Sequence, residues 1–230
     1  MEEQRPLAAI FERQWVHALV LAAMLAVLWF ISRGCSCFHR GELWGVGTWT
    51  WFWIAVAVPI VHQVFVWFCW RTELHRSLIS RVFGRHGFVI YAAIFTVFLV
   101  GRLVVITLLA IASRDTLPVN HALLKTLAVI IAIPTVYLFY SVASYFGLKR
   151  AYGADHFYVT YRAMPLVREG IFRFTSNGMY IFGLLVLYIP ALWSASRPAL
   201  VAAIFNHLYI WVHYLTVELP DMRRIYGSNP

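Results

Sequence analysis

Charged residues are scarce in this chain, which excludes an ordinary soluble domain. Only 13% of its 230 residues are charged and 61% are hydrophobic, whereas soluble domains carry about 25% charged residues. Cysteine is scarce too: three residues are present, and the Cys35-x-Cys37 pair has no set of His or Cys partners beside it. Such a pair is a weak metal signal, and two residues is a strained spacing for a disulfide. We therefore expect three ordinary cysteines and no metal site.

Polar segments divide the apolar sequence into six runs, each long enough to cross a bilayer. The chain is therefore predicted to be an all-α integral membrane protein with about six transmembrane helices. The expected spans cover residues 15–31, 43–70, 87–112, 119–147, 178–194 and 198–217. They define an N-terminal tail (1–14), four transmembrane helices (15–147) and a C-terminal segment (148–230) whose two spans form a hairpin.

The distribution of Lys and Arg predicts how the helices are oriented. When the 71–86 loop is placed in the cytoplasm, the cytoplasmic segments hold thirteen Lys and Arg residues and the external segments hold four. By the positive-inside rule, both termini are then cytoplasmic. Orientation and attraction to anionic lipid also explain the net charge of +9, so we expect no nucleic-acid partner.

Polar residues stand at both ends of the C-terminal hairpin. Its first span follows Asn177-Gly178, and its second span ends at Glu218. Because a hairpin returns its two ends to one membrane face, Asn177 and Glu218 are expected to meet on the cytoplasmic side, although forty-one residues separate them. Two plainer interpretations stay open: Asn177-Gly178 only caps a helix, and Glu218 with the charged residues after it forms a solvated helix end.

A polar and aromatic stripe leads along the last span to Glu218. His207, Trp211 and Tyr214 precede it at spacings that place all four side chains on one helix face. Such a stripe inside a membrane faces protein or a cavity, so it either lines an acceptor tunnel or forms a helix contact. Arg102 lies in mid-span. It either binds a lipid phosphate, pairs with Glu73 or Asp115, or extends to the membrane surface.

Five short fragments occur around the hairpin in an order typical of one family. They are Tyr145-Phe146-Gly147, Gly170-x-Phe172-Arg173, Asn177-Gly178-Met179-Tyr180-x-x-Gly183, Glu218-x-Pro220 and Ile225-Tyr226-Gly227. Residues 140–227 thus resemble the membrane methyltransferases that include phosphatidylethanolamine N-methyltransferase and isoprenylcysteine carboxyl methyltransferase. Asn before the Met-Tyr pair is similar to the phospholipid enzymes, although those tend to carry paired glutamates where this chain has Val217-Glu218.

The resemblance implies S-adenosylmethionine as methyl donor and makes residues 148–230 the catalytic segment. The residues implied in donor binding are Gly147, Gly170, Arg173, Asn177, Tyr180, Gly183, Glu218 and Tyr226. Asn177, Tyr180 and Glu218 are also the candidate catalytic residues. A carboxylate suits the donor's ribose or amino group, and the Tyr180 ring suits its sulfonium cation. Whether Glu218 holds the donor or takes a proton from the acceptor stays open.

The predicted activity is methylation of a membrane lipid, on the amine of phosphatidylethanolamine or of its partly methylated forms. The substrate-binding candidates are His207, Trp211, Tyr214 and Arg102. A prenylated cysteine carboxylate and a small thiol stay open as acceptors. The non-enzymatic alternative is a small transporter or scaffold, but transporters tend to show internal repeats, and this sequence has none. The site is expected to face the cytoplasm, and the oligomeric state is not predicted.

Overall fold

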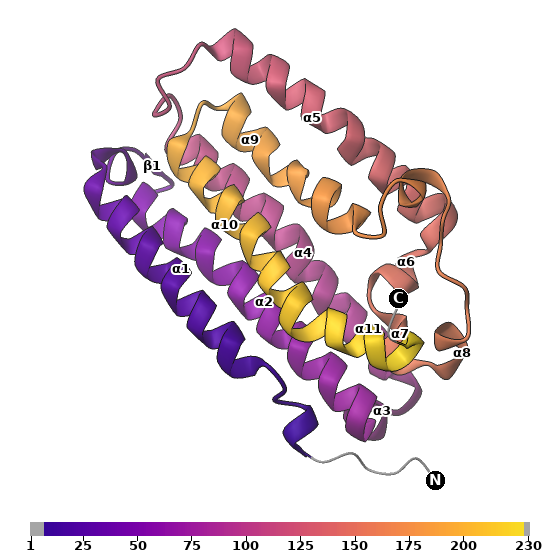
Figure 1. Ribbon diagram of the computed structural model, residues 1–230. Coiled ribbons are helices and arrows are strands. Elements are labelled where there is room, and N and C mark those ends of the chain that lie inside the picture. The colour runs from indigo at the N-terminus through magenta and orange to yellow at the C-terminus, as the bar shows by residue number, and fades with distance from the viewer. Residues whose placement is uncertain (1–6, 228–230) are drawn as a thin grey trace.

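The computed structural model describes residues 7–227, which are almost entirely helical (Figure 1). Five helices in this range are long and apolar enough to cross a membrane. They are α1 (Gln14–Gly34), α2 (Thr48–Arg76), α4 (Gly87–Ala112), α5 (His121–Ser141) and α10 (Arg197–His213), which continues through η8 (Tyr214–Glu218) and α11 (Leu219–Tyr226). A shorter apolar helix comprises η6 (Met179–Gly183), η7 (Leu184–Leu187) and α9 (Tyr188–Trp193). The predicted class, an all-α integral membrane protein, is confirmed.

The long helices form one bundle with α5 at its edge (Figure 1). Helix α2 packs against α4 and α10, and the shorter helix ending in α9 lies between α10 and α5. The core among α1, α2, α4 and α10 includes Phe52, Ile106 and Tyr209, all fully buried. Ala202 and Ala203 of α10 are fully buried in the same core, and small residues of this kind let membrane helices approach closely.

Local sequence explains where two of the helices begin. Asn120 caps α5, because its side-chain oxygen accepts hydrogen bonds from the backbone N–H groups of Ala122 (2.8 Å) and Leu123 (3.2 Å). Ser196 caps α10 by accepting a backbone hydrogen bond at 3.2 Å. Pro198 lies in the first turn of α10, where its missing N–H costs no helical hydrogen bond. These caps fix the turns that separate the spans.

Helix α2 begins later than predicted. The expected span started at residue 43, but Glu42–Leu43 (β1) and Val46–Gly47 (β2) pair as a small antiparallel hairpin, and the helix starts at Thr48. The connecting residues Trp44 and Gly45 both have positive φ, 56° and 74°, which is typical of a two-residue hairpin turn. The Gly at the second position makes this turn possible, and the turn delays the helix.

The expectation of three ordinary cysteines is wrong for two of them. Cys35 and Cys37 form a disulfide around the short helix η2 (Ser36–Phe38). Their Cα atoms lie 5.3 Å apart, within the range that a disulfide requires. The turn after α1 therefore overcomes a sequence spacing that is unfavourable in an extended chain. Cys69 is buried and free.

Short helical segments cover one end of the bundle. They are η1 (Leu7–Ala9), α3 (Leu78–Phe83), η3 (Gly84–His86), η4 (Val142–Phe146), α6 (Leu148–Ala151), α7 (Ala154–Phe157), α8 (Val159–Arg162) and η5 (Gly170–Arg173). Helix α7 packs on α2, where the rings of Trp70 and His156 stack with centroids 4.2 Å apart. Gly153 has φ of +81°, and a Cβ there would lie 2.5 Å from the Trp70 ring. Only glycine fits this contact.

Candidate active site

The structure brings Tyr180 and Glu218 into direct contact. Tyr180 lies in η6 and Glu218 ends η8, and the Tyr180 hydroxyl donates a hydrogen bond to Glu218 Oε2 across 38 residues of sequence. Glu218 is partly buried. The charges of Asp221 and Asp155 are close enough to act on the Glu218 carboxylate. The two ends of the hairpin therefore form one polar locus.

Aromatic rings surround the Tyr180–Glu218 contact on one side. The Tyr180 ring centroid lies 5.8 Å from that of Trp211 and 5.3 Å from that of Tyr214. The Trp211 and Tyr214 rings meet edge to face at 5.6 Å. His207 lies further along the same helix and contacts Tyr188 at 5.7 Å instead. The stripe thus divides into an aromatic part beside the carboxylate and a histidine deeper in the bundle.

Three π-helical segments occur at this end of the bundle. They are η4 after α5, η6 before α9 and η8 after α10. A π turn inserts a residue into an α-helix and redirects the side chains beside it, and such turns are frequent at functional sites. Tyr180 lies within η6, and Tyr214 and Glu218 lie within η8. The contact between the two helices is therefore built from irregular turns on both sides.

Asn177 and two of the predicted donor-binding glycines serve local structure. The backbone carbonyl of Asn177 accepts hydrogen bonds from the N–H groups of Tyr180 (3.0 Å) and Ile181 (3.1 Å), which begins the helix. A Cβ on Gly170 would lie 2.5 Å from Ser141 Oγ, and one on Gly183 would lie 3.0 Å from a Leu138 methyl. These glycines allow close packing against α5.

The remaining donor-binding candidates are Gly147, Arg173 and Tyr226. Gly147 is exposed, has φ of +85° and has open space where a Cβ would stand. Arg173 is exposed, and its guanidinium lies 5.9 Å from the Phe174 ring centroid. Tyr226 is partly buried, and its hydroxyl accepts a hydrogen bond from Arg150 at 3.2 Å. Among residues 7–227, no group of three or more His, Cys, Asp or Glu side chains could hold a metal ion.

A buried ion pair that the sequence did not predict lies next to the site. Arg71 and Asp221 are both 0% exposed, and Arg71 Nε donates to the Asp221 carboxylate at 2.8 Å. Arg71 also donates to the carbonyl oxygens of Ala9 (2.8 Å), Thr216 (3.2 Å) and Val217 (3.2 Å). The guanidinium therefore ties α2 to the N-terminal segment, to η8 and to α11.

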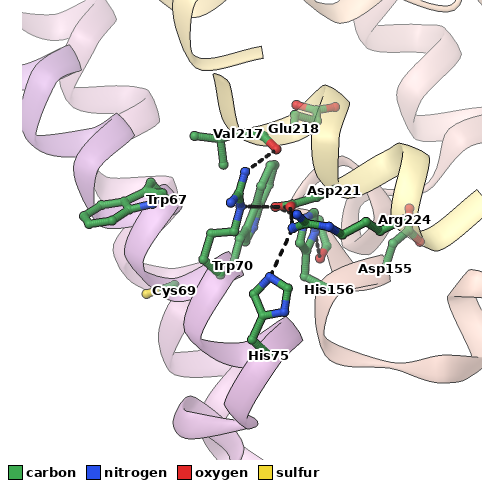
Figure 2. A network of polar contacts seen from close by, with 12 residues as sticks. Trp67, Cys69, Trp70, His75, Asp155, His156, Val217, Glu218, Asp221 and Arg224 are labelled. Atoms are coloured by element: carbon green, nitrogen blue, oxygen red, sulfur yellow. Dashed lines mark hydrogen bonds and ion pairs between the residues drawn. The ribbon is translucent and has the colours of Figure 1, made fainter. Parts of the chain in front are cut away.

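Asp221 is the centre of this network (Figure 2). His156 and Arg224 stand around it, with nitrogen–oxygen distances of 3.5 Å and 3.7 Å. Glu218 lies one turn earlier on the same helix and points away from the network (Figure 2). The interpretation of these residues as a solvated helix end is therefore wrong for Asp221. Helix α2 also extends six residues beyond its predicted end, to Arg76, because Arg71 is bonded inside the protein.

A second charged pair holds the segment after α5. Arg150 is buried, lies 3.7 Å from Asp155 and donates to the carbonyl oxygen of Pro165 at 2.8 Å. Burial raises the pKa of Asp155 above its usual range, and the nearby Arg150 charge opposes this shift. Arg150 donates a hydrogen bond to Tyr226 and so joins the polar segment after α5 (residues 148–169) to α11. The polar segment and the C-terminal helix therefore form one unit beside Glu218.

Arg102 lies apart from the Tyr180–Glu218 contact, in the middle of α4. It is 4% exposed, and its Nε and Nη2 atoms have no hydrogen-bond partner among the described residues. Glu73 instead accepts hydrogen bonds from Ser80, and Asp115 forms an exposed ion pair with a histidine. Pairing with these carboxylates and extension to the membrane surface are therefore both wrong. The titratable side chains close enough to interact with the Arg102 charge include His62, Tyr209 and His213.

The structure is thus an all-α membrane bundle with a carboxylate and aromatic rings together at one end of a helical hairpin. The family model for phospholipid methyltransferase matches residues 123–229, a range that includes Tyr180, Trp211, Tyr214 and Glu218. A phosphatidylethanolamine N-methyltransferase of Komagataella phaffii is 31% identical over 78 residues, which are 34% of this chain and 9% of that protein. No solved structure matches the chain. The predicted resemblance to the membrane methyltransferases is confirmed for residues 123–229.

Proposed function

We propose that the chain is an S-adenosylmethionine-dependent methyltransferase that acts on the amine of phosphatidylethanolamine or of its partly methylated forms. One observation carries the proposal: Tyr180 and Glu218 meet within the part of the chain that matches the phospholipid methyltransferase family. The relative from Komagataella phaffii is a phosphatidylethanolamine N-methyltransferase by name. The aligned segment is a small part of that protein, so the acceptor is a proposal for this chain.

The residues beside Glu218 fit the proposed donor. S-adenosylmethionine supplies an electrophilic methyl group on a sulfonium cation. The rings of Tyr180, Trp211 and Tyr214 offer faces that attract a cation. Glu218 has carboxylate oxygens that can accept hydrogen bonds from an amino group or from ribose hydroxyls. Arg173 is exposed and suits a carboxylate partner. The rings and Glu218 thus attract positive charge, and Arg173 is proposed to hold the donor's acid group.

The chain's own residues have three tasks in methyl transfer. Tyr180 orients Glu218 through its hydroxyl, and the aromatic rings restrict water around the reacting atoms. Glu218 either holds the donor or takes the proton that an acceptor ammonium must lose before its nitrogen can attack. Asn177 is proposed to support both groups by starting the helix that carries Tyr180. His207 is proposed as an acceptor contact deeper in the bundle.

We also propose that the end of the bundle carrying Glu218 faces the cytoplasm. The thirteen-to-four distribution of basic residues supports this orientation. The first and last described segments meet at this end, where Glu12 forms an ion pair with Arg224. Arg81 and Arg85 are exposed on α3 and η3, at the start of α4. A soluble donor made in the cytoplasm would then reach the site directly.

Incubation with methyl-labelled donor tests the function. Purified protein would be mixed with labelled S-adenosylmethionine and a membrane lipid extract, and the labelled products would be identified by mass analysis. We expect label on phosphatidylethanolamine-derived lipids and no label when vesicles contain only phosphatidylcholine. Label on a prenylated cysteine peptide or a small thiol, supplied in parallel reactions, would replace the lipid acceptor. Absence of label in every reaction would reject the methyltransferase proposal.

A further inference from the structure

A groove opens on the side of the bundle between the first half of α4 and the polar segment after α5. Its volume is about 400 Å³, and its lining includes Val89, Ala93 and Thr96 from α4 and Lys149, Tyr152 and Tyr158 from the polar segment. This volume is within the range of sites that bind small molecules. The groove lies on a part of the protein that faces the bilayer, because its α4 wall belongs to a membrane-spanning helix.

The groove combines an apolar wall with one cation. Val89 is 63% exposed and Ala93 is also exposed, so this wall presents hydrocarbon to the outside. Tyr152 forms part of the opposite wall and is fixed by a 3.1 Å hydrogen bond with Thr96. Lys149 is exposed and, within residues 7–227, makes no ion pair. An apolar wall beside an uncompensated cation suits an amphiphile with an anionic group.

The inner wall of the groove adjoins the Glu218 site. The Tyr152 ring contacts Phe95, with centroids 4.9 Å apart, and Phe95 contacts Tyr91 at 5.9 Å. Tyr91 is buried and lies close enough to Glu218 to interact with its charge. The groove is thus separated from Glu218 by a layer of aromatic side chains.

We propose that this groove binds the phospholipid acceptor, with one acyl chain against Val89 and Ala93 and the phosphate at Lys149. The inference rests on the proposed function and adds the place of the acceptor. A phospholipid is the occupant because it is the abundant amphiphile around a membrane helix and because its phosphate complements the Lys149 charge. Lys149, rather than Arg102, is then the phosphate contact, since Arg102 is only 4% exposed and Lys149 is exposed in the groove. The headgroup amine then reaches Glu218 only when the side chains of Tyr152, Phe95 and Tyr91 move aside.

Photo-cross-linking tests the groove without any methyl transfer. The protein in nanodiscs would be labelled with phosphatidylethanolamine carrying a diazirine on one acyl chain, and separately with diacylglycerol carrying the same chain. We expect the phospholipid probe to label residues 88–96 and 148–158 about tenfold more than the diacylglycerol probe does, and Lys149→Glu to abolish this difference. Equal labelling by both probes, or a difference that survives Lys149→Glu, would overturn the proposal.

A filled groove provides the second test. Ala93→Trp should raise the KM for phosphatidylethanolamine about fivefold or more, with donor affinity unchanged, because the indole would occupy the acyl-chain space. Ala23→Trp is the matched control, since Ala23 is exposed on α1. Equal KM values for the two variants would overturn the groove as the acceptor site. If selective labelling is found but wild-type protein methylates no phospholipid, the groove stands and the proposed activity fails.

Discussion

Removal of the Asp221 charge should destabilise the protein strongly. Asp221→Asn keeps the shape of the side chain but leaves Arg71 as a buried charge without its counter-ion. Both side chains are 0% exposed, and the Arg71 Nε–carboxylate distance is 2.8 Å. Breaking a buried pair of this kind costs about 3–5 kcal/mol. The free energy of unfolding would be measured by denaturant titration of purified protein in detergent micelles.

An exposed aspartate provides the matched control. Asp115 is 62% exposed and pairs with His121 at 3.4 Å, so Asp115→Asn should cost less than about 1 kcal/mol. In a double-mutant cycle, Arg71→Met and Asp221→Asn should couple by about 1.5 kcal/mol or more. The structural role of the pair would be refuted if Asp221→Asn lowered the free energy of unfolding no more than Asp115→Asn does. It would also be refuted if the effects of Arg71→Met and Asp221→Asn were additive.

Three further predictions concern other charged residues. Arg102→Met should not lower stability, because two guanidinium nitrogens of Arg102 have no partner among the described residues. The same variant should leave the acceptor KM unchanged if Lys149 holds the phosphate, whereas a raised KM would favour Arg102 as the phosphate contact. Burial raises the pKa of Asp155, so the contribution of Asp155 to stability should fall as pH rises above about 4, and the melting temperature of Asp155→Asn should rise relative to that of wild type between about pH 4 and pH 7; parallel curves would contradict this. A cysteine at Arg85 should react with an impermeant thiol reagent only from the cytoplasmic side, and one at Arg114 only from the outside; the reverse would invert the proposed orientation.

Much of the fold could be predicted from hydropathy because membrane spans must be apolar over their whole length. Residues 87–112 were predicted as a span, and α4 has the same bounds. The prediction failed at α2, whose beginning depends on the Trp44-Gly45 turn and whose end depends on a buried arginine. Neither feature changes local hydropathy in a recognisable way, so only the tertiary structure places these ends.

The candidate site could be predicted in part. The meeting of Tyr180 and Glu218 follows from the topology of a hairpin, which the two adjoining apolar runs indicate. The Arg71–Asp221 pair joins residues 150 positions apart, and a charged residue just beyond an apolar run is ordinarily interpreted as a membrane-surface anchor. The signal that could have identified it is the exact position of Arg71, directly after Trp70 in an unbroken helical pattern. The packing role of Gly170 likewise depends on Ser141 of another helix.

Donor binding by a Glu218→Gln variant tests the central proposal most directly. Isothermal calorimetry with S-adenosylmethionine would compare wild type, Glu218→Gln and the control Glu42→Gln, which alters an exposed glutamate of β1. If Glu218 holds the donor, its affinity should fall about ten- to a hundredfold in Glu218→Gln, the loss of a charge-assisted hydrogen bond, and stay unchanged in Glu42→Gln. If Glu218 is the base, donor affinity should stay intact while methyl transfer falls. Normal donor affinity together with normal turnover in a folded Glu218→Gln variant would contradict the assignment of the site to Glu218.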